Sequence, residues 1–438
     1  IWCKETVCSA PIIMFLYYRC FIAKDWRSSG RGLKLVLPYI ALSVVSYYLS
    51  VPHDYGKRVA SYWNWWEYLL TQSNVLIEYV RLLLLPLPGR LNVDADFPLS
   101  ETLWEFPTLL SGASIAAIVV TAVLLLDRSR LVAFSILWFF VTLAPTSSIM
   151  PLHEIMVSYR LYLPGVGFYL LLVVGIHKVF CYFFTKMMFE PKQLWLAELA
   201  VFMCIVMFYG ACAYEHNKVF RTEVLLWEDT VKKSPNKIRP HYGLGRAYHK
   251  AGQVDRAREQ YQICGRLYHA ASNMRDRNEI KCAGMACNNL GLTYINAGQY
   301  DAAIPILKEA INIRDSNAEV HCNLAYCYVN TGKTEAAETE YKLALGFSAK
   351  HSQIYTGLGL VYEIKGMPEE AIRAYAKAVE LDTANTNAHF RLGHLWLNHS
   401  KNPTRATYHL REALAQSTDK EDRKRILAKI ESMAEISP

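Results

Sequence analysis

Side chains that could do chemistry lie in two short segments of the amino-terminal half. The first segment contains Asp94-Ala95-Asp96, a D-x-D triplet of the kind that binds a metal and the phosphates of sugar nucleotides. Two carboxylates two positions apart also occur in solvated loops that do no chemistry. A catalytic or metal-binding role for Asp94 and Asp96 and a merely solvated loop are therefore the two interpretations of this triplet.

The second segment runs from Pro145 to Pro164 and contains His153, Glu154 and Arg160. A guanidinium forms bidentate hydrogen bonds with phosphate, so Arg160, with His153 close in the sequence, is a candidate phosphate-binding group. Glu154 is a further candidate catalytic acid or base. The alternative for Arg160 is that its charged end reaches the lipid headgroups and only anchors the chain.

Long apolar stretches must position these segments. Each has close to the 20 or so apolar residues that cross a hydrocarbon core. The six candidate spans are residues 5–23, 33–51, 104–126, 131–150, 162–185 and 194–214. Residues 1–214 therefore predict a transmembrane helix bundle of about six spans.

Basic residues between the first two spans fix the expected orientation. The segment Lys24–Lys34 is strongly basic, and the positive-inside rule places it in the cytoplasm. Residues 69–88 contain Gln72, Asn74, Glu78 and Arg81, which are costly at mid-bilayer, so we expect an interfacial or re-entrant helix there. The carboxyl-terminal half then lies outside the cytoplasm. If residues 69–88 cross the membrane, the carboxyl-terminal half lies in the cytoplasm instead.

The carboxyl-terminal half carries an internal repeat. The pattern Leu-Gly/Ala-x-x-Tyr/Trp begins at Leu290, Leu324, Leu358 and Leu392, which are spaced 34 residues apart. That period is typical of the tetratricopeptide repeat, a helix-turn-helix unit that stacks into a solenoid. We expect five repeats at 238–419, a linking helix at 215–237 and a capping helix at 420–438.

Such solenoids present a groove that binds extended peptide. Asn288, Asn289 and Asn323 fall on first helices of the repeats, where their amides can pair with a peptide backbone. The alternative is that these are ordinary solvated polar positions. The pattern therefore predicts a protein partner bound through the repeats.

Charge and cysteine usage exclude little more. A net charge of +8 over 438 residues is modest, and membrane topology explains part of it, so no nucleic-acid partner is expected. The 11 cysteines include no CxxC pair with zinc spacing. The chain begins with Ile and shows no basic leader, so we expect it to start inside a larger protein.

These observations together predict an all-α chain, in which a multi-span transmembrane helix bundle is followed by a tetratricopeptide-repeat α-solenoid. The motifs also carry a family resemblance. They are Lys4-Glu5-Thr6 before an apolar span, Leu70–Val75 leading to Leu85-Pro86, Asp94–Pro98, Arg160–Pro164, and Leu226–Thr230 followed by Ser234-Pro235. In this order they resemble the GT-C-fold membrane glycosyltransferases that end in tetratricopeptide repeats, a group that includes protein O-mannosyltransferases.

The resemblance implies transfer of a sugar, typically mannose, from a polyprenyl-phosphate carrier to Ser or Thr of an acceptor protein. Arg160 and His153 would then bind the lipid phosphate, and the repeats would recruit the acceptor. No cofactor is expected, since the lipid-linked sugar is a substrate, and the use of a metal stays open. The family's catalytic acidic residue is expected upstream of this chain, and Ser158 and Tyr159 stand where the family commonly has a charged or imidazole residue.

A non-catalytic membrane scaffold that tethers a peptide-binding solenoid is the alternative function. For location, the family likeness favours a bacterial inner membrane with periplasmic repeats. An endoplasmic-reticulum membrane with lumenal repeats fits the charges equally well.

Overall fold

The computed structural model describes residues 9–23, 29–50, 64–145, 147, 155–186, 191–271, 276–313 and 318–434, and every regular element within these ranges is helical. The chain divides into two compact units. The first contains residues 1–240 and 275–277, and the second contains residues 241–274 and 278–438. The prediction of an all-α chain is confirmed for the described residues.

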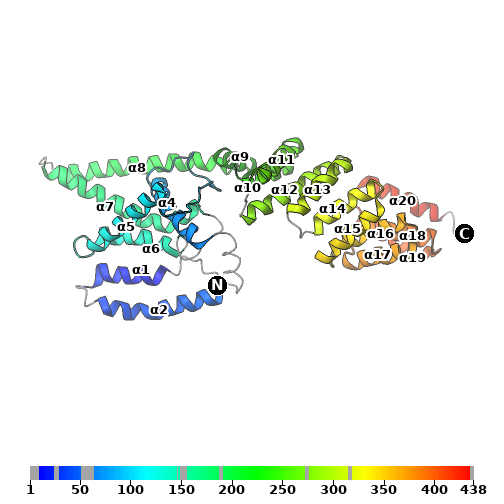
Figure 1. The fold of residues 1–438 in the computed structure, drawn as a ribbon, viewed down its shortest axis with the longest axis horizontal. Helices are drawn as coiled ribbons and strands as arrows, with labels where there is room; N and C mark the ends of the chain where they lie inside the picture. The colour runs from blue at the N-terminus through cyan, green and yellow to red at the C-terminus, as the bar shows by residue number, and fades with distance from the viewer. Residues whose placement is uncertain are drawn as a thin grey trace. The chain divides into compact units, whose positions relative to one another are not determined.

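The first unit is built mainly from apolar helices (Figure 1). A π-helical turn, Tyr18–Ile22, follows its first helix, and a 3₁₀ turn, Ser158–Leu161, precedes α7. The helices are α1 (Ala10–Tyr17), α2 (Ser29–Ser50), α4 (Trp65–Leu84), α5 (Phe106–Leu124), α6 (Arg130–Ala144), α7 (Tyr162–Lys186), α8 (Pro191–Val219) and α9 (Glu223–Lys233).

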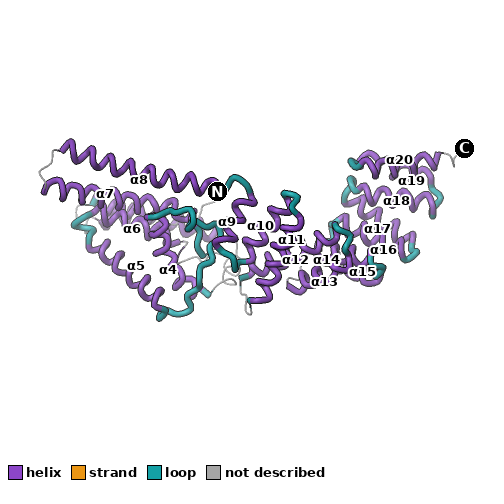
Figure 2. Tube along the Cα trace, turned by 90° about the horizontal axis from the view of Figure 1, so that it is seen from above, coloured by secondary structure: helices purple, strands orange, loops and turns teal. Residues whose placement is uncertain are grey.

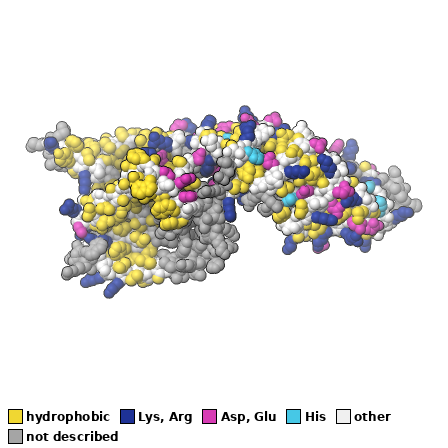
Figure 3. All heavy atoms as spheres, viewed as in Figure 1, with side chains coloured by type: hydrophobic (Ala, Val, Ile, Leu, Met, Phe, Trp, Pro, Cys, Tyr) yellow, Lys and Arg dark blue, Asp and Glu magenta, His cyan; other side chains and the backbone are white. Residues whose placement is uncertain are grey.

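Three helical segments of this unit are long and apolar enough to cross a membrane: Phe106–Leu124, Ser158–Phe183 and Lys192–Val219. Two shorter apolar helices, Ala10–Ile22 and Arg130–Ala144, correspond to two further predicted spans. Hydrophobic side chains cover much of this unit's visible surface in Figure 3, whereas charged side chains are interspersed over the repeats. The bundle of six spans stays a prediction beyond these three helices.

Small residues let the apolar helices approach closely. A Cβ atom at Gly167 of α7 would lie 2.6 Å from the backbone oxygen of Ser135 in α6. The indole nitrogen of Trp138 also donates to the carbonyl of Leu163 over 2.9 Å. Close approach at glycine is typical of helices packed in lipid, where dispersion contacts replace the hydrophobic effect.

The second unit is a series of antiparallel helix pairs followed by a terminal helix (Figure 2). The pairs are α10 (Ile238–Lys250) with α11 (Val254–Ala270), α12 (Arg277–Asn296) with α13 (Tyr300–Ile313), α14 (Ala318–Asn330) with α15 (Thr334–Phe347), α16 (Ser352–Ile364) with α17 (Pro368–Leu381), and α18 (Thr386–Asn398) with α19 (Pro403–Gln416). The last helix, α20 (Lys420–Ala434), packs on α19, where its Ile430 lies against the cluster of Ala406 and Leu410, and its Ile426 is buried.

The repeated Leu positions form the core of this unit, as predicted. Leu244, Leu290, Leu324, Leu358 and Leu392 are all at most 6% exposed. The glycine that follows Leu290 is needed because a Cβ atom at Gly291 would lie 2.6 Å from Leu307 of the partner helix. Gly298 ends α12 in the left-handed region, with φ +72°, where other residues are strained.

Candidate functional site

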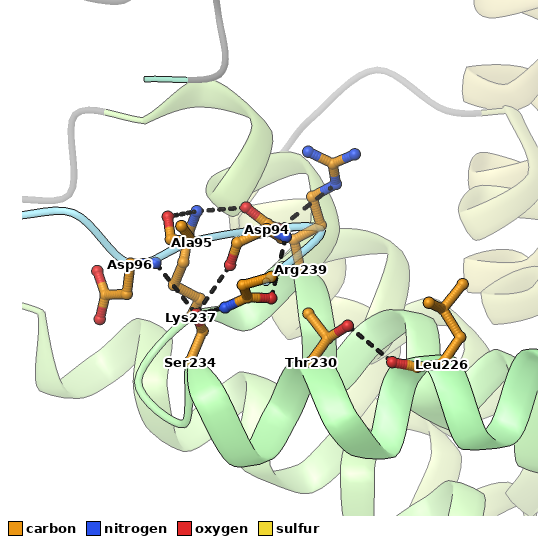
Figure 4. Close-up of polar contacts among 9 residues, drawn as sticks. Asp94, Ala95, Asp96, Leu226, Thr230, Ser234, Lys237 and Arg239 are labelled. Carbon is orange, nitrogen blue, oxygen red and sulfur yellow. Dashed lines mark hydrogen bonds and ion pairs between the residues drawn. The ribbon is translucent and has the colours of Figure 1, made fainter. Parts of the chain in front are cut away.

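The loop that contains the D-x-D triplet lies between α4 and α5 and is held by Ser234, at the end of α9 (Figure 4). The Ser234 hydroxyl donates to the carbonyl of Asp94 over 2.8 Å and accepts from the amide of Asp96 over 3.1 Å. The side-chain amide of Asn92 donates to the same hydroxyl over 2.8 Å. One serine therefore fixes the backbone on both sides of the triplet.

The Asp94 carboxylate faces two cations. Its Oδ1 is 2.5 Å from Nζ of Lys237, and its Oδ2 is 3.6 Å from Nε of Arg239. The next lysine back along the chain, Lys233, donates to the carbonyls of Pro88 and Leu91, each over 2.7 Å. These contacts join the loop to the end of α9 and the start of α10.

The two carboxylates of the triplet have different surroundings. Asp94 is 5% exposed and paired, whereas Asp96 is exposed, and Figure 4 shows its carboxylate pointing away from the Lys237 contact. Lys237 and Arg239 already balance the negative charge of Asp94, which a bound metal ion would otherwise balance. The geometry therefore favours a structural ion pair at Asp94, and the metal-binding role stays a prediction.

Arg160 lies in the 3₁₀ turn before α7 and is 7% exposed. Its Nη1 donates to the carbonyl of Ile155 over 3.3 Å, and its side chain is also hydrogen-bonded to the hydroxyl of Tyr79. The guanidinium is thus held in one place beside α4. His153 and Glu154 lie outside the described residues.

Two residues of α4, neither of them predicted as a site residue, hold the backbone before Arg160. The Tyr79 hydroxyl donates to the carbonyl of Val157 over 3.1 Å and accepts from its amide over 3.0 Å. The Gln72 side chain donates to the carbonyl of Ile155 over 2.9 Å. Gln72 and Tyr79 are seven positions apart, which places them on one helix face, and that spacing was the available signal.

Two of the three asparagines of the repeats, Asn288 and Asn323, lie in one polar network. The amide of Asn323 donates to the carbonyl oxygen of Asn288 over 3.0 Å, and the amide of Asn288 donates to Glu319 over 3.3 Å. Asn288 is 4% exposed, so its amide positions its neighbours rather than a ligand. Asn289 and Asn323 are both partly exposed.

Aromatic rings lie next to Asn289. Its amide is 3.5 Å from the hydroxyl of Tyr261, and the ring of Tyr261 lies 6.4 Å from that of Tyr242. Burial raises the pKa of Tyr261 to about 12, so its hydroxyl stays protonated. The exposed Arg246 lies over the Tyr242 ring at 5.8 Å. The surface around Asn289 therefore presents amide, hydroxyl and guanidinium groups next to two tyrosine rings.

Comparison with known proteins identifies the repeats. Tetratricopeptide-repeat models match residues 238–262, 294–359 and 352–385. No curated protein matches the chain. The described helix pairs and these matches show that the chain carries tetratricopeptide repeats, which are protein-interaction modules.

Solved structures that are similar to parts of the chain include several repeat proteins. MamA 41-end from Desulfovibrio magneticus RS-1 is 16% identical, with a TM-score of 0.35 over 41% of this chain and 94% of that chain. YrrB, described as a TPR protein with an unusual peptide-binding site, is 16% identical, with a TM-score of 0.36 over 45% and 96%. The APC/C hetero-tetramer Cut9-Hcn1 is 17% identical, with a TM-score of 0.40 over 76% and 60%.

Proposed function

We propose that this chain is a membrane-associated tetratricopeptide-repeat protein that binds an extended segment of a partner protein. The observation that carries this proposal is the placement of Asn289 and Asn323. Each directly precedes the repeat Leu of its first helix, in α12 and α14, and each is partly exposed. A side-chain amide has both donor and acceptor groups, so two amides in register match the backbone of an extended peptide.

Neighbouring side chains hold these two amides in position. Asn288 accepts a hydrogen bond from Asn323, and the Tyr261 hydroxyl lies beside Asn289. A group whose rotamer is fixed before binding loses less conformational entropy when a ligand binds. The apolar helices α5, α7 and α8 support the membrane association in this proposal.

Site-specific photo-crosslinking in the full chain tests the peptide-binding role. A photoreactive residue in place of Asn323 should capture a partner polypeptide, and one in place of Lys342, which is 59% exposed on the second helix α15, should not. Replacing Asn289 with Ala should reduce capture at position 323 about 5- to 10-fold, because one amide hydrogen bond contributes roughly 1 kcal/mol. Equal capture at positions 323 and 342 would contradict the proposal.

Glycosyl transfer from a polyprenyl-phosphate sugar is the second candidate function, and Arg160 is the observation that favours it. Its guanidinium is held by Ile155 and Tyr79 and is therefore pre-positioned, as a group that stabilises a departing phosphate must be. In this reaction a carboxylate would accept the proton of the acceptor hydroxyl. The repeats would then recruit the acceptor protein.

Sugar transfer by the full-length protein tests this second function. Replacing Arg160 with Ala should lower transfer from a polyprenyl-phosphate mannose to an acceptor peptide about 10- to 100-fold, because a hydrogen bond to a charged group contributes roughly 1.5–3 kcal/mol. Arg160→Lys should retain more transfer activity than Arg160→Ala but less than the unmodified protein, since a point charge lacks the bidentate geometry of a guanidinium. Arg81→Ala, at a 64% exposed arginine of α4, is the matched control. Unchanged transfer by Arg160→Ala would leave Arg160 as a lipid-headgroup anchor.

A further inference from the structure

Three side chains of metal-ligating type converge between α7 and α8, away from the residues discussed above. His177 and Cys181 are four positions apart on one face of α7, and Glu198 faces them from α8. Nδ1 of His177 lies 2.8 Å from Oε1 of Glu198, and Sγ of Cys181 lies 3.5 Å from Nε2 of His177. One ligand atom from each residue lies within 4.8 Å of the others.

These separations are close to those of a tetrahedral zinc site. Zinc bonds of about 2.3 Å to sulfur and about 2.0–2.1 Å to nitrogen place the two ligand atoms roughly 3.6 Å apart. The Cys181 sulfur lies 3.9 Å from Nδ1 of His177, the ring nitrogen that faces Glu198, and needs to approach it by about 0.3 Å to share an ion. The carboxylate of Glu198 is hydrogen-bonded to the ring and needs to withdraw by about 0.6 Å to share an ion with it.

The surroundings make this cluster unusual. It lies on two of the three helices that are apolar and long enough to cross a membrane, and those helices run side by side in both ribbon and tube views (Figures 1 and 2). His177 and Glu198 line a groove of about 830 Å³ whose other lining residues are mostly apolar. Ionisable groups that face each other at membrane depth are costly, and they typically mark functional sites.

The donor set selects the class of ion. An imidazole, a thiolate and a carboxylate suit Zn²⁺, whereas Mg²⁺ and Ca²⁺ prefer oxygen ligands alone. Within the described part of the chain, this is the one group of three such ligands from His, Cys, Asp and Glu. His177 keeps 59% and Glu198 keeps 25% of its side chain exposed, so an ion between them can be reached from the groove.

We propose that His177, Cys181 and Glu198 bind one zinc-class divalent cation that links α7 to α8. Three protein ligands leave a fourth coordination position, which opens to the groove for water or another small ligand. The cation would neutralise the carboxylate and thiolate between two apolar helices. The site is separate from the D-x-D triplet and from Arg160, and it stands whether or not the chain takes part in sugar transfer.

Cobalt titration of the untagged, full-length chain in lipid nanodiscs tests this proposal. Co²⁺ added to metal-free protein should bind at one equivalent, with the visible bands of a tetrahedral site and a thiolate-to-cobalt charge-transfer band. Cys181→Ser should abolish that band and weaken binding by at least 10-fold. Cys204→Ser, at an exposed cysteine on α8, is the matched control and should leave both unchanged.

A second variant separates the metal site from a simple hydrogen bond between the helices. Glu198→Gln can retain a hydrogen bond to His177 but is a much poorer ligand, so it should lose cobalt while keeping the helical circular-dichroism signal. Binding without a charge-transfer band, a Cys181→Ser variant that behaves like Cys204→Ser, or binding at several equivalents through the chain's 11 cysteines would overturn the proposal.

Discussion

Asp94 and Lys237 form an ion pair whose partners are 143 positions apart in the chain. Because Asp94 is only 5% exposed, removing one partner leaves a charge in surroundings that solvate it poorly. Asp94→Asn and Lys237→Met should each loosen the loop after α4. The double variant should be less destabilised than the sum of the two, by about 1–3 kcal/mol. Limited proteolysis of that loop in the intact chain measures the effect.

Asp96→Asn is the control for this double-mutant cycle. Asp96 is exposed, so its substitution should leave the loop as protected as in the unmodified chain. If Asp94 and Asp96 instead act together on a metal, the two single variants should behave alike, and a divalent cation should protect the loop. Strict additivity of Asp94→Asn and Lys237→Met would contradict the structural ion pair.

Residue-scale roles were predictable only where the evidence is local. Asp94 and Asp96 form a pair in the sequence because they are neighbours, but Lys237 and Ser234 separate their surroundings, and no short motif encodes partners so far along the chain. In contrast, the burial of Leu324 follows from the period of one repeat. The cluster of His177, Cys181 and Glu198 was not predicted from the sequence, because its third ligand belongs to the next helix.

At the level of the elements, Leu324 tests the packing of a single repeat. It is 1% exposed and belongs to a core cluster with residues from each helix from α12 to α17. Leu324→Ala should destabilise this repeat by about 2–5 kcal/mol, and its neighbours should also open more often, because repeats support one another. Hydrogen–deuterium exchange of the intact chain should show faster exchange in α13–α16.

The matched control for Leu324 lies on the neighbouring helix. Leu343 of α15 has the same side chain but is 48% exposed. Leu343→Ala removes little buried surface, so exchange in α13–α16 should barely change. Similar acceleration by the two variants would mean that the repeat Leu does not carry the packing of this region.

The pairing of α18 with α19 contains two adjacent imidazoles. Nδ1 of His389 lies 3.1 Å from Nδ1 of His409. Burial lowers the pKa of His409 to about 4, with the charges of His389 and Arg405 acting in the same direction, and burial also lowers the pKa of His389. Two positive charges at this distance repel each other strongly, so the folded state keeps the pair uncharged at neutral pH.

This arrangement predicts a local loss of stability in acid. The folded-state pKa of His409 lies below its ordinary value of 6.5, so the unfolded state binds more protons as the pH falls. The stability of α18–α19 should be complete above pH 6.5 and should decline towards pH 4. Hydrogen–deuterium exchange, corrected for its intrinsic pH dependence, should accelerate in α18–α19 and not in α16–α17, which contains no histidine.

His409→Gln provides the second arm of the pH experiment. Glutamine cannot acquire a proton in this range, so the acid-dependent acceleration in α18–α19 should shrink in this variant. His351→Gln, at an exposed histidine before α16, should leave it unchanged. Acceleration of equal size in α18–α19 and α16–α17 would show that the histidine pair is not its cause.

Helices of the two units were predictable to different extents. In the repeats, the 34-residue period places each core Leu, and the structure buries all five. In the apolar unit, hydropathy finds α5, α7 and α8 but says little about which faces meet. The contacts of Gln72 and Tyr79 with residues 155–157 depend on the arrangement of α4 in three dimensions, which composition does not contain.

For the whole molecule, the central question is which side of the membrane each unit faces. The basic segment Lys24–Lys34 favours the cytoplasm. After it, the three long apolar helices α5, α7 and α8 contribute an odd number of crossings. Adding α2 and α6 leaves the number odd, at five. Both counts therefore predict that the repeats lie on the side opposite to Lys24–Lys34.

The decisive element for this topology is α4. It is not among the helices that are apolar and long enough to span, and its Gln72 and Tyr79 bond to residues 155–157. Reporters inserted after Gly252 and, separately, into Lys24–Lys34 should therefore report opposite sides, with the repeat reporter outside the cytoplasm. With five crossings, α2 included, a third reporter after Gly89, in the loop that follows α4, should lie on the same side as the repeats. Cytoplasmic signal from the repeats, with the Gly89 reporter also on the cytoplasmic side, would mean that α4 crosses the membrane and that the repeats meet cytoplasmic partners.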